Sequence, residues 1–416
     1  MNGRKPYREI ASLEEVHDFY ERLPYPAPLT TLEGHRELYQ DFDRRRSQFH
    51  LLWPIDPLRG NLEILVAGCG TSQAARYALR ERDARVTAID ISETSLVHTR
   101  ALQRTYDLKN LELHQLPIES VRKLGRTFDL IVCTGVLHHL PDPDLGLRAL
   151  RDVLKPEGAM SLMVYAPYGR AGIYMLQEYC RLLGIRLANG DLKDLGDTLR
   201  ALPSIHPISP ALRSALDFNH PDMLADAMLH PLDRAYSVPE LFAWLERCGM
   251  SFGRWVEQAP YLPQCGIIAK TPHAARLAAL PQPAQSAAVE LFRGTMLRHK
   301  FVVYREDSKR ERQPIDFVGK RWQEYVPIRS PSSVCVRERL PVGCAAVLIN
   351  RSHPFTDLLL TIDESEDRLL SAIDGKRTMT DILERAGNGA DEDHALRFFE
   401  RLWQYDQITC DASRCS

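Results

Sequence analysis

A glycine-rich turn and an acidic residue beyond it have the types and spacing needed to bind a nucleoside. The segment ILVAGCGTS, Ile64–Ser72, is an apolar run that leads into a turn with two glycines, and a helix is expected to open at about Gln73. Glycine lets a ligand approach the backbone closely, and a helix start offers free N–H groups. Asp90 ends the next apolar run, VTAID, 20 residues after Gly70. A carboxylate there can accept both hydroxyls of an adenosine ribose.

The third position of the glycine pattern separates two classes of cofactor. A dinucleotide site has the pattern GxGxxG, whose third glycine lets the helix pack close around a pyrophosphate. In this chain that position is Gln73. S-adenosylmethionine has no phosphate, so two glycines and a polar Thr71 or Ser72 suffice for its amino-acid end. The turn therefore favours an adenosyl cofactor over NAD.

Four motifs occur in a fixed order between residues 60 and 167: AGCGTS, VTAIDIS, FDLIVCTGVLHHLPDP and LRDVLKPEGAMSLMVY. In order and spacing this segment resembles the class I S-adenosylmethionine-dependent methyltransferase family. The resemblance implies a Rossmann-like α/β fold, S-adenosylmethionine as donor and S-adenosylhomocysteine as product. It also implies a cofactor site made of Ala67, Gly68, Cys69, Gly70, Asp90, Ile91, Thr134 and Gly135.

One contact of the family is missing from its usual position. Many relatives have an acidic residue after the third strand that binds the adenine amino group, whereas this chain has His114, Gln115 and Leu116 there. Glu119, farther along, is the candidate that replaces it, and a backbone group is the alternative.

Methyl transfer is an in-line displacement in which the leaving sulfide needs no proton, so a base is required only if the acceptor loses one. The candidate catalytic residues are His138, Tyr168 and Tyr25. In the family the VLHH sequence more often has a packing role. No Cys, Asp or Glu stands beside the two histidines at ligand spacing, so we expect no metal.

Three polar patches are candidates for the acceptor site, each with packing as the alternative role. The first, FYERLPYPAP, contains Tyr20 and Tyr25, and the second, YAPYGRAGIY, follows the fifth predicted strand. The third is a loop in which turn formation, with Asp233 paired to Arg234, is the alternative. The substrate-binding candidates from these patches are Tyr20, Tyr165, Arg170, His230 and Tyr236.

Alternating apolar runs and helical stretches predict a parallel sheet wrapped by helices. The expected strands are Glu63–Ala67, Arg85–Ile89, Leu111–His114, Phe128–Cys133, Ala159–Tyr165, Phe252–Gln258 and His299–Arg305. The predicted organisation is an N-terminal helical lid (1–60), a methyltransferase domain (61–306) with a helical cap insert (168–235), a linker (307–334) and a small α+β domain (335–416).

The last domain is predicted to contain two paired strands, CAAVLIN and LLLTID, then three helices and a final strand, QITCD. It weakly resembles winged-helix and PqqD-like domains. Residues 335–416 have 10 Lys plus Arg against 15 Asp plus Glu, a net charge of −5. Because phosphate contacts dominate nucleic-acid affinity, we expect a protein contact there, such as a homodimer, and no nucleic-acid partner.

The whole chain has 416 residues, a formal charge of −2 and nine cysteines without CxxC pairs. With no targeting signal or apolar span, this composition predicts a cytoplasmic protein with no membrane partner and no disulfide framework. The function hypothesis is methyl transfer to a small molecule. The alternatives are a peptide or protein acceptor recognised by the C-terminal domain, and an inactive binding scaffold, which the intact Gly68, Gly70 and Asp90 disfavour.

Overall fold

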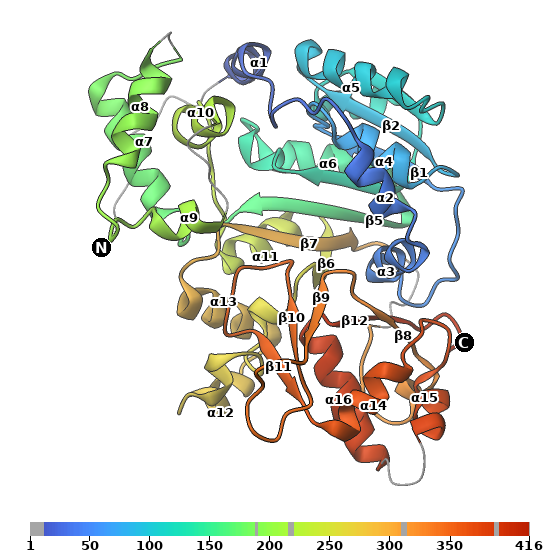
Figure 1. Cartoon of the computed structure of the whole chain (residues 1–416). Helices are drawn as coiled ribbons and strands as arrows, with labels where there is room; N and C mark the ends of the chain where they lie inside the picture. The colour runs from blue at the N-terminus through green and yellow to red at the C-terminus, as the bar shows by residue number, and fades with distance from the viewer. Residues whose placement is uncertain (1–11, 188–189, 215–219, 309–313, 387–390, 416) are drawn as a thin grey trace. The chain divides into compact units, whose positions relative to one another are not determined.

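The computed structural model describes residues 12–187, 190–214, 220–308, 314–386 and 391–415 (Figure 1). They form two compact units, each built from three separate segments. The first contains Met1–Arg36, Gly60–Gly253 and Arg293–Ser308, and the second contains Glu37–Arg59, Arg254–Phe292 and Lys309–Ser416. The boundaries expected at 60, 306 and 334 stay predictions. No helix in the described ranges is both long and apolar enough to cross a bilayer.

A seven-stranded sheet of order β3-β2-β1-β4-β5-β7-β6 organises the first unit. Strands β1 to β5 pair in parallel, and β7 runs antiparallel to β5. Its strands are β1 Glu63–Ala67, β2 Arg85–Asp90, β3 Leu111–Gln115, β4 Phe128–Thr134, β5 Leu154–Tyr165, β6 Met250–Trp255 and β7 Arg298–Arg305. This arrangement confirms the predicted Rossmann-like sheet.

Two strands differ from their predicted bounds. β5 begins at Leu154, five residues before the expected Ala159, because Leu154 already pairs with Phe128 across an irregularity in the ladder. β6 begins at Met250 and ends at Trp255, whereas the sequence favours a strand from Phe252 to Gln258. In both cases turn-like residues near the strand end hide the true boundary.

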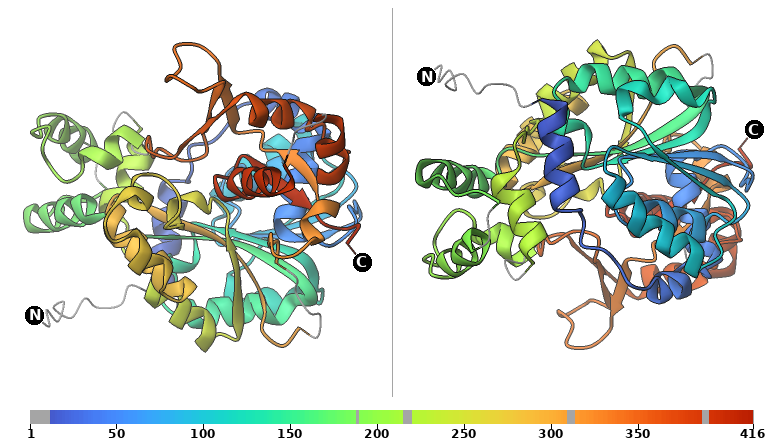
Figure 2. Two further views of the ribbon diagram at one scale, coloured as in Figure 1. Left: turned by 90° about the horizontal axis from the view of Figure 1, so that it is seen from below. Right: turned by 90° about the horizontal axis from the view of Figure 1, so that it is seen from above.

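The helices that follow the glycine turn pack on the sheet or on the 3-10 helices that follow its strands. α4 contacts β2 and β3, α5 contacts the same two strands, and α6 packs on the 3-10 helices η1 and η2. α1 lies beside α5 (Figure 2). Their bounds are α1 Leu13–Arg22, α4 Gln73–Arg80, α5 Glu93–Thr105, η1 Ile118–Leu124, η2 Leu137–His139, α6 Pro143–Val153 and α11 Val238–Arg247.

Capping fixes where two of these helices begin. The side chain of Ser12 accepts the amide of Glu15 at the start of α1, while the Glu15 carboxylate accepts the amide of Ser12. Ser237 and Glu240 form the same reciprocal cap on α11. The cap on α11 confirms its prediction from the spacing of these two residues.

The segment 168–235 is helical, as expected, and lies within the first unit. Its helices are α7 Ala171–Leu183, α8 Asp191–Arg200, α9 Ser209–Ser214 and α10 Pro221–Leu229. α7, α8 and α10 share an apolar core that includes Leu176, Leu195 and Leu224. Asp226 of α10 lies within hydrogen-bond distance of Tyr165, at the end of β5.

The second unit contains a three-stranded antiparallel sheet, β11-β10-β9, and a two-stranded sheet, β12-β8. Its strands are β8 Val326–Arg329, β9 Ser333–Val336, β10 Ala346–Asn350, β11 Leu359–Ile362 and β12 Ile408–Asp411. Its helices are α2 Glu33–Tyr39 (which begins in the first unit), α3 Phe42–Leu52, α12 Ala274–Ala278, α13 Gln282–Arg293, α14 Glu364–Ala372, α15 Met379–Ala386 and α16 Glu392–Gln404. Short 3-10 helices are η3 Ala259–Tyr261, η4 Ile267–Lys270 and η5 Arg321–Glu324.

One apolar core joins the C-terminal elements of the second unit. Trp322 and Tyr325, which precede β8, are buried in it together with Phe398 and Phe399 of α16. The predicted pairing of β10 with β11, the three helices and the final strand are all confirmed. The winged-helix likeness stays a prediction.

Candidate active site

The turn after β1 has the backbone that only glycine adopts easily. Gly68 and Gly70 have φ of +68° and +55°, the left-handed region in which a Cβ is strained. Because Ala67 pairs with Ile89 across the parallel ladder, this turn and the residue after Ile89 meet at the same edge of the sheet. The amide of Gly70 donates a hydrogen bond of 2.7 Å to Oδ2 of Asp90.

Asp90 is buried at the end of β2 and is held by two backbone amides. Its Oδ1 accepts the amide of Ser92 at 2.9 Å, and its Oδ2 accepts Gly70. Burial raises the pKa of the Asp90 carboxyl, which these hydrogen bonds partly offset. Each carboxylate oxygen keeps a second lone pair, so a pair of ribose hydroxyls can still be accepted.

The segment after α1 packs directly on the glycine turn. A Cβ on Gly70 would lie 2.6 Å from the carbonyl oxygen of Tyr25. The hydroxyl of Thr71 donates to the carbonyl of Pro26 at 2.7 Å. The space left by the missing side chain of Gly70 is therefore occupied by Tyr25 and Pro26. The N-terminal segment packs on the turn, and its role as a lid stays a prediction.

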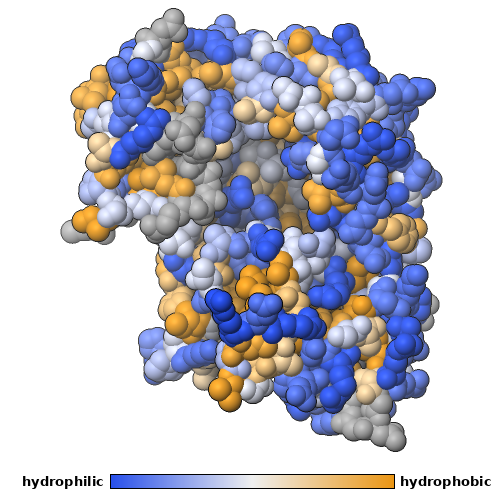
Figure 3. Space-filling view, viewed as in Figure 1, coloured by the Kyte–Doolittle hydropathy of each residue, from blue (hydrophilic) through white to orange (hydrophobic). Residues whose placement is uncertain are grey.

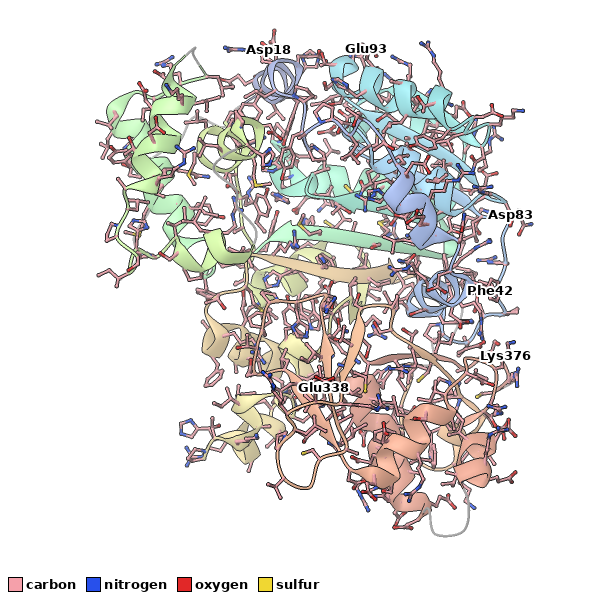
Figure 4. The ribbon with its side chains drawn as sticks, in the orientation of Figure 1. Asp18, Phe42, Asp83, Glu93, Glu338 and Lys376 are labelled. Carbon is pink, nitrogen blue, oxygen red and sulfur yellow. The ribbon has the colours of Figure 1, made fainter. Side chains whose placement is uncertain are left out.

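The end of α1 also binds the loop that follows Asp90. The carbonyl of Tyr20 accepts the hydroxyl of Ser92, and the carboxylate of Glu21 accepts the amide of Glu93 at 2.5 Å. Glu93 opens α5, and Figure 4 shows it near the same edge as Asp18 of α1. A carboxylate at a helix N-terminus is favourable because it meets the free N–H groups there. These contacts fix α1 beside the Asp90 loop.

The remaining cofactor candidates lie after β2, β3 and β4. Ile91 follows Asp90, and its carbonyl accepts the side-chain amide of Gln115 at 3.1 Å. Thr134 ends β4, and Gly135, with φ of +79°, donates its amide to Met163. Glu119 lies in η1, and its buried Oε2 has no hydrogen-bond partner among the described residues. An unpartnered buried acceptor in this position fits an adenine amino group.

A second group of side chains surrounds Asp226, which points inward from α10 and is 4% exposed. Its two oxygens accept the hydroxyls of Tyr20 at 3.3 Å and of Tyr165 at 3.2 Å. Burial raises the pKa of the Asp226 carboxyl and of both tyrosines. We call Tyr20, His139, Tyr165, Asp226 and His230 the polar cluster. Figure 3 shows the surface hollowed beside α10.

Histidines form one wall of the polar cluster. The rings of His139 and His230 lie 3.9 Å apart between centroids, and Nδ1 of His139 is 2.6 Å from the carbonyl oxygen of Leu232. His138 is fully buried, and its ring lies 4.0 Å from that of Tyr165. Burial holds the pKa of His138 well below its usual value, so this imidazole is neutral.

A buried ion pair lies next to the cluster. Arg170 donates to Asp233 at 2.7 Å, Gln177 donates to the same oxygen at 2.8 Å, and the Arg170 guanidinium lies 3.5 Å from the centre of the Tyr165 ring. Asp233 thus pairs with Arg170, and the alternative pairing with Arg234 is wrong. The sequence cannot reveal this pair, because its two residues come from different ends of the cap segment.

Two of the candidate tyrosines, Tyr168 and Tyr236, lie outside the polar cluster. Tyr168 is 41% exposed in the turn after β5, and Tyr236 stacks on Trp244 at 4.8 Å while its amide pairs with the carbonyl of Tyr165. Tyr25 is closer to the cluster: burial, together with the charge of Asp226, raises its pKa to about 12. The roles of these three tyrosines stay predictions.

Residues 65–160 match a family described as a methyltransferase domain. Ubiquinone biosynthesis O-methyltransferase of Pseudomonas fluorescens is 32% identical over 125 residues, which cover 27% of this chain and 53% of that protein. An uncharacterized protein of Synechococcus sp. is 38% identical over 264 residues, 60% of this chain and 63% of the relative. The chain thus spans between half and two thirds of these relatives.

Residues 65–160 form a class I S-adenosylmethionine-dependent methyltransferase domain. The structure of PKMT2 from Rickettsia typhi in complex with AdoHcy has the same fold, with a TM-score of 0.62 and 14% identity over 89% of this chain and 75% of that one. The methyl donor of such a domain is S-adenosylmethionine. The glycine turn, Asp90 and Glu119 of this methyltransferase domain fit that molecule.

Sequence reasoning missed Asp226, and of the two adjacent histidines it selected His138 and not His139 as the catalytic candidate. Asp226 stands in MLADAML, where a single acid interrupts an otherwise apolar helix. Such an acid is rarely buried without a polar partner. This isolated charge was the available signal, but its partners on α1 and β5 are 206 and 61 residues away.

Proposed function

We propose that this chain transfers the methyl group of S-adenosylmethionine to a small molecule whose reacting group reaches the polar cluster. The observation that carries the proposal is the hydrogen bond from Gly70 to Asp90, 2.7 Å long, because it brings the turn after β1 and the carboxylate after β2 to one place. Those two elements are the ones that an adenosyl group needs.

Four residues would hold the donor. The turn at Gly68 and Gly70 would lie against its amino-acid end, Asp90 would accept the ribose hydroxyls, and Glu119 would accept the adenine amino group through its unpartnered Oε2. When bound, S-adenosylmethionine supplies a methyl group on a sulfonium, whose departure as a neutral thioether needs no proton. The contribution of the chain is to orient the two reactants and to exclude water.

The position of the polar cluster supports an acceptor site there. Tyr165 ends β5, and β5 neighbours β4, the strand that leads to Gly135. Tyr20 connects the two sites: its carbonyl accepts Ser92 beside Asp90, while its hydroxyl donates to Asp226.

The burial of the cluster favours a small molecule as acceptor. Asp226, His139 and His230 are each at most 4% exposed. Only a narrow group of the acceptor can therefore reach these side chains. The 125-residue likeness to a ubiquinone biosynthesis O-methyltransferase also supports a hydroxyl-bearing acceptor.

Isothermal titration calorimetry of the full chain with S-adenosylhomocysteine tests the donor site. Micromolar binding with a stoichiometry of about one is expected, and the absence of heat at millimolar ligand would refute the proposal. Turnover can then be followed with methyl-labelled S-adenosylmethionine and a panel of small phenols and amines. Label found only in added peptide or protein would contradict the small-molecule acceptor.

A further inference from the structure

The backbone C=O and N–H of Leu232 fix the protonation of two neighbouring histidines, His139 and His230, in opposite ways. Its carbonyl can only accept, so the Nδ1 of His139, 2.6 Å away, must carry a proton. Its amide can only donate, so the Nδ1 of His230, 3.0 Å away, must be bare. A neutral imidazole carries one proton. His139 therefore has a free lone pair on Nε2, whereas His230 carries its proton there.

Asp226 is the counter-charge for this pair. A nitrogen of each ring and one Asp226 oxygen all lie within 4.8 Å of one another. In the part of the chain that the structure describes, no Lys or Arg forms an ion pair with Asp226, whose hydrogen-bond partners are the hydroxyls of Tyr20 and Tyr165. The nearby charge of Arg170 is already balanced by Asp233. The hydrogen bond from Tyr165 favours the ionised form of Asp226 against the effect of burial, and that negative charge can stabilise a protonated His139.

Neither neighbouring histidine can accept a proton as readily. His138 has no hydrogen-bond partner for either ring nitrogen among the described residues, and burial together with the charges of His139 and Arg170 disfavours its protonation. The bare nitrogen of His230 already accepts the amide of Leu232. His139 alone combines a bare nitrogen with a nearby carboxylate.

A metal ion fits this group of residues less well. A ligating imidazole binds the metal through one nitrogen and usually donates a hydrogen bond from the other. His139 meets this condition, but the second nitrogen of His230 faces an N–H group. The two ring centroids are also only 3.9 Å apart, whereas two imidazoles that bind one ion from different directions are splayed.

We propose that His139 accepts the proton that the acceptor loses on methylation, and that Asp226 stabilises the resulting imidazolium. This rests on the proposed function. The acceptor atom forms a bond to the methyl carbon, the bond from that carbon to sulfur breaks with its electron pair on sulfur, and the acceptor proton passes to Nε2 of His139. The acceptor is thereby a group with a lone pair and a proton to lose, a hydroxyl or an amine. Asp226 and Leu232 are positioning residues.

Nitrogen-15 NMR of the histidine rings in the full chain tests this assignment without any acceptor. Spectra at pH 8, with and without S-adenosylhomocysteine, should show the Nδ1–H tautomer for His139 and the Nε2–H tautomer for His230. The His139→Gln variant assigns the signal by removing it. A His139 ring with its proton on Nε2 would overturn the proposal, as would a perturbation of these signals by stoichiometric Zn²⁺.

The role of Asp226 is tested by Asp226→Asn at pH 6. The fraction of His139 present as imidazolium should fall severalfold, because removal of a nearby opposite charge disfavours the charged form. Asp222→Asn, one turn earlier on α10, is the matched control and should leave the fraction unchanged. An equal fraction in the Asp226 variant and the wild type would overturn the pairing. Calorimetry with S-adenosylhomocysteine reports separately on the donor site, so the two proposals can fail independently.

Discussion

The amide of Gly70 and the carboxylate of Asp90 are joined by a 2.7 Å hydrogen bond, although 20 residues separate them in the chain. The parallel pairing of β1 with β2 produces this contact, since it places both strand ends at one edge of the sheet. The turn is therefore shaped by the same carboxylate that is proposed to bind the ribose.

Replacing Asp90 with alanine should weaken S-adenosylhomocysteine binding by on the order of 2 kcal/mol, or about 30-fold, because charge-assisted hydrogen bonds are lost. Titration calorimetry measures the change. Asp83→Ala, in the exposed turn before β2, is the control and should bind as the wild type does. Equal affinities of the two variants would show that Asp90 does not contact the ligand.

Gly70→Ala should destabilise the protein more than Gly125→Ala does. Both residues have positive φ, +55° and +64°, so each substitution strains the backbone by about 1 to 2 kcal/mol. A Cβ at Gly125 meets nothing within 4 Å, whereas one at Gly70 meets the carbonyl of Tyr25 at 2.6 Å. The overlap should add roughly 1 to 3 kcal/mol. Urea denaturation of both variants gives the difference, and equal losses would contradict the close packing of Tyr25.

Arg170→Met should cost about 3 to 5 kcal/mol of unfolding free energy, because it leaves Asp233 as an uncompensated buried charge. The two side chains are 5% and 0% exposed. Arg181→Met removes an arginine from an exposed pair with Glu178 on α7 and should change stability by less than about 1 kcal/mol. Thermal unfolding of the two variants compares them. A loss at Arg170 as small as that at Arg181 would mean that the buried pair contributes little.

The sheet could be predicted from the sequence because local patterns determine it. Apolar runs such as Ile64–Ala67 are too short for helices, and the glycines that follow them require a turn. The carboxyl ends of parallel strands then share one edge, which is enough to bring Asp90 to the turn. The sequence predicted correctly those features that depend only on one strand and the strand paired with it.

The polar cluster could not be predicted because packing across three distant segments creates it. Nothing local separates Tyr165, which is half-buried and bonded to Asp226, from Tyr168, which is exposed in the turn three residues later. Asp226 becomes buried only when α1 and β5 meet α10. The tautomer of His139 depends on the backbone of Leu232, 93 residues away, whose direction no sequence pattern records.

A pH-dependent loss of stability is expected from Asp406 in the second unit. Burial raises the pKa of its carboxyl to about 7, while Arg254 and the amide of Ala259 partly oppose the shift. The folded state therefore holds this proton more tightly than the unfolded state does. The stabilisation is fully present below the unfolded value near 3.8 and is lost as pH rises through about 7.

Asp406→Asn tests this, because asparagine tolerates the φ of +54° at this position and can still accept the amide of Ala259. Between pH 4.5 and pH 8 the wild type should lose on the order of 3 kcal/mol more than the variant, since each pKa unit corresponds to about 1.4 kcal/mol. Urea denaturation at both pH values measures the difference. Asp393→Asn, exposed on α16, should follow the wild type. If Asp406→Asn instead parallels the wild type at both pH values, the carboxyl ionises in the folded protein as easily as in the unfolded chain, and the burial of Asp406 has no energetic consequence.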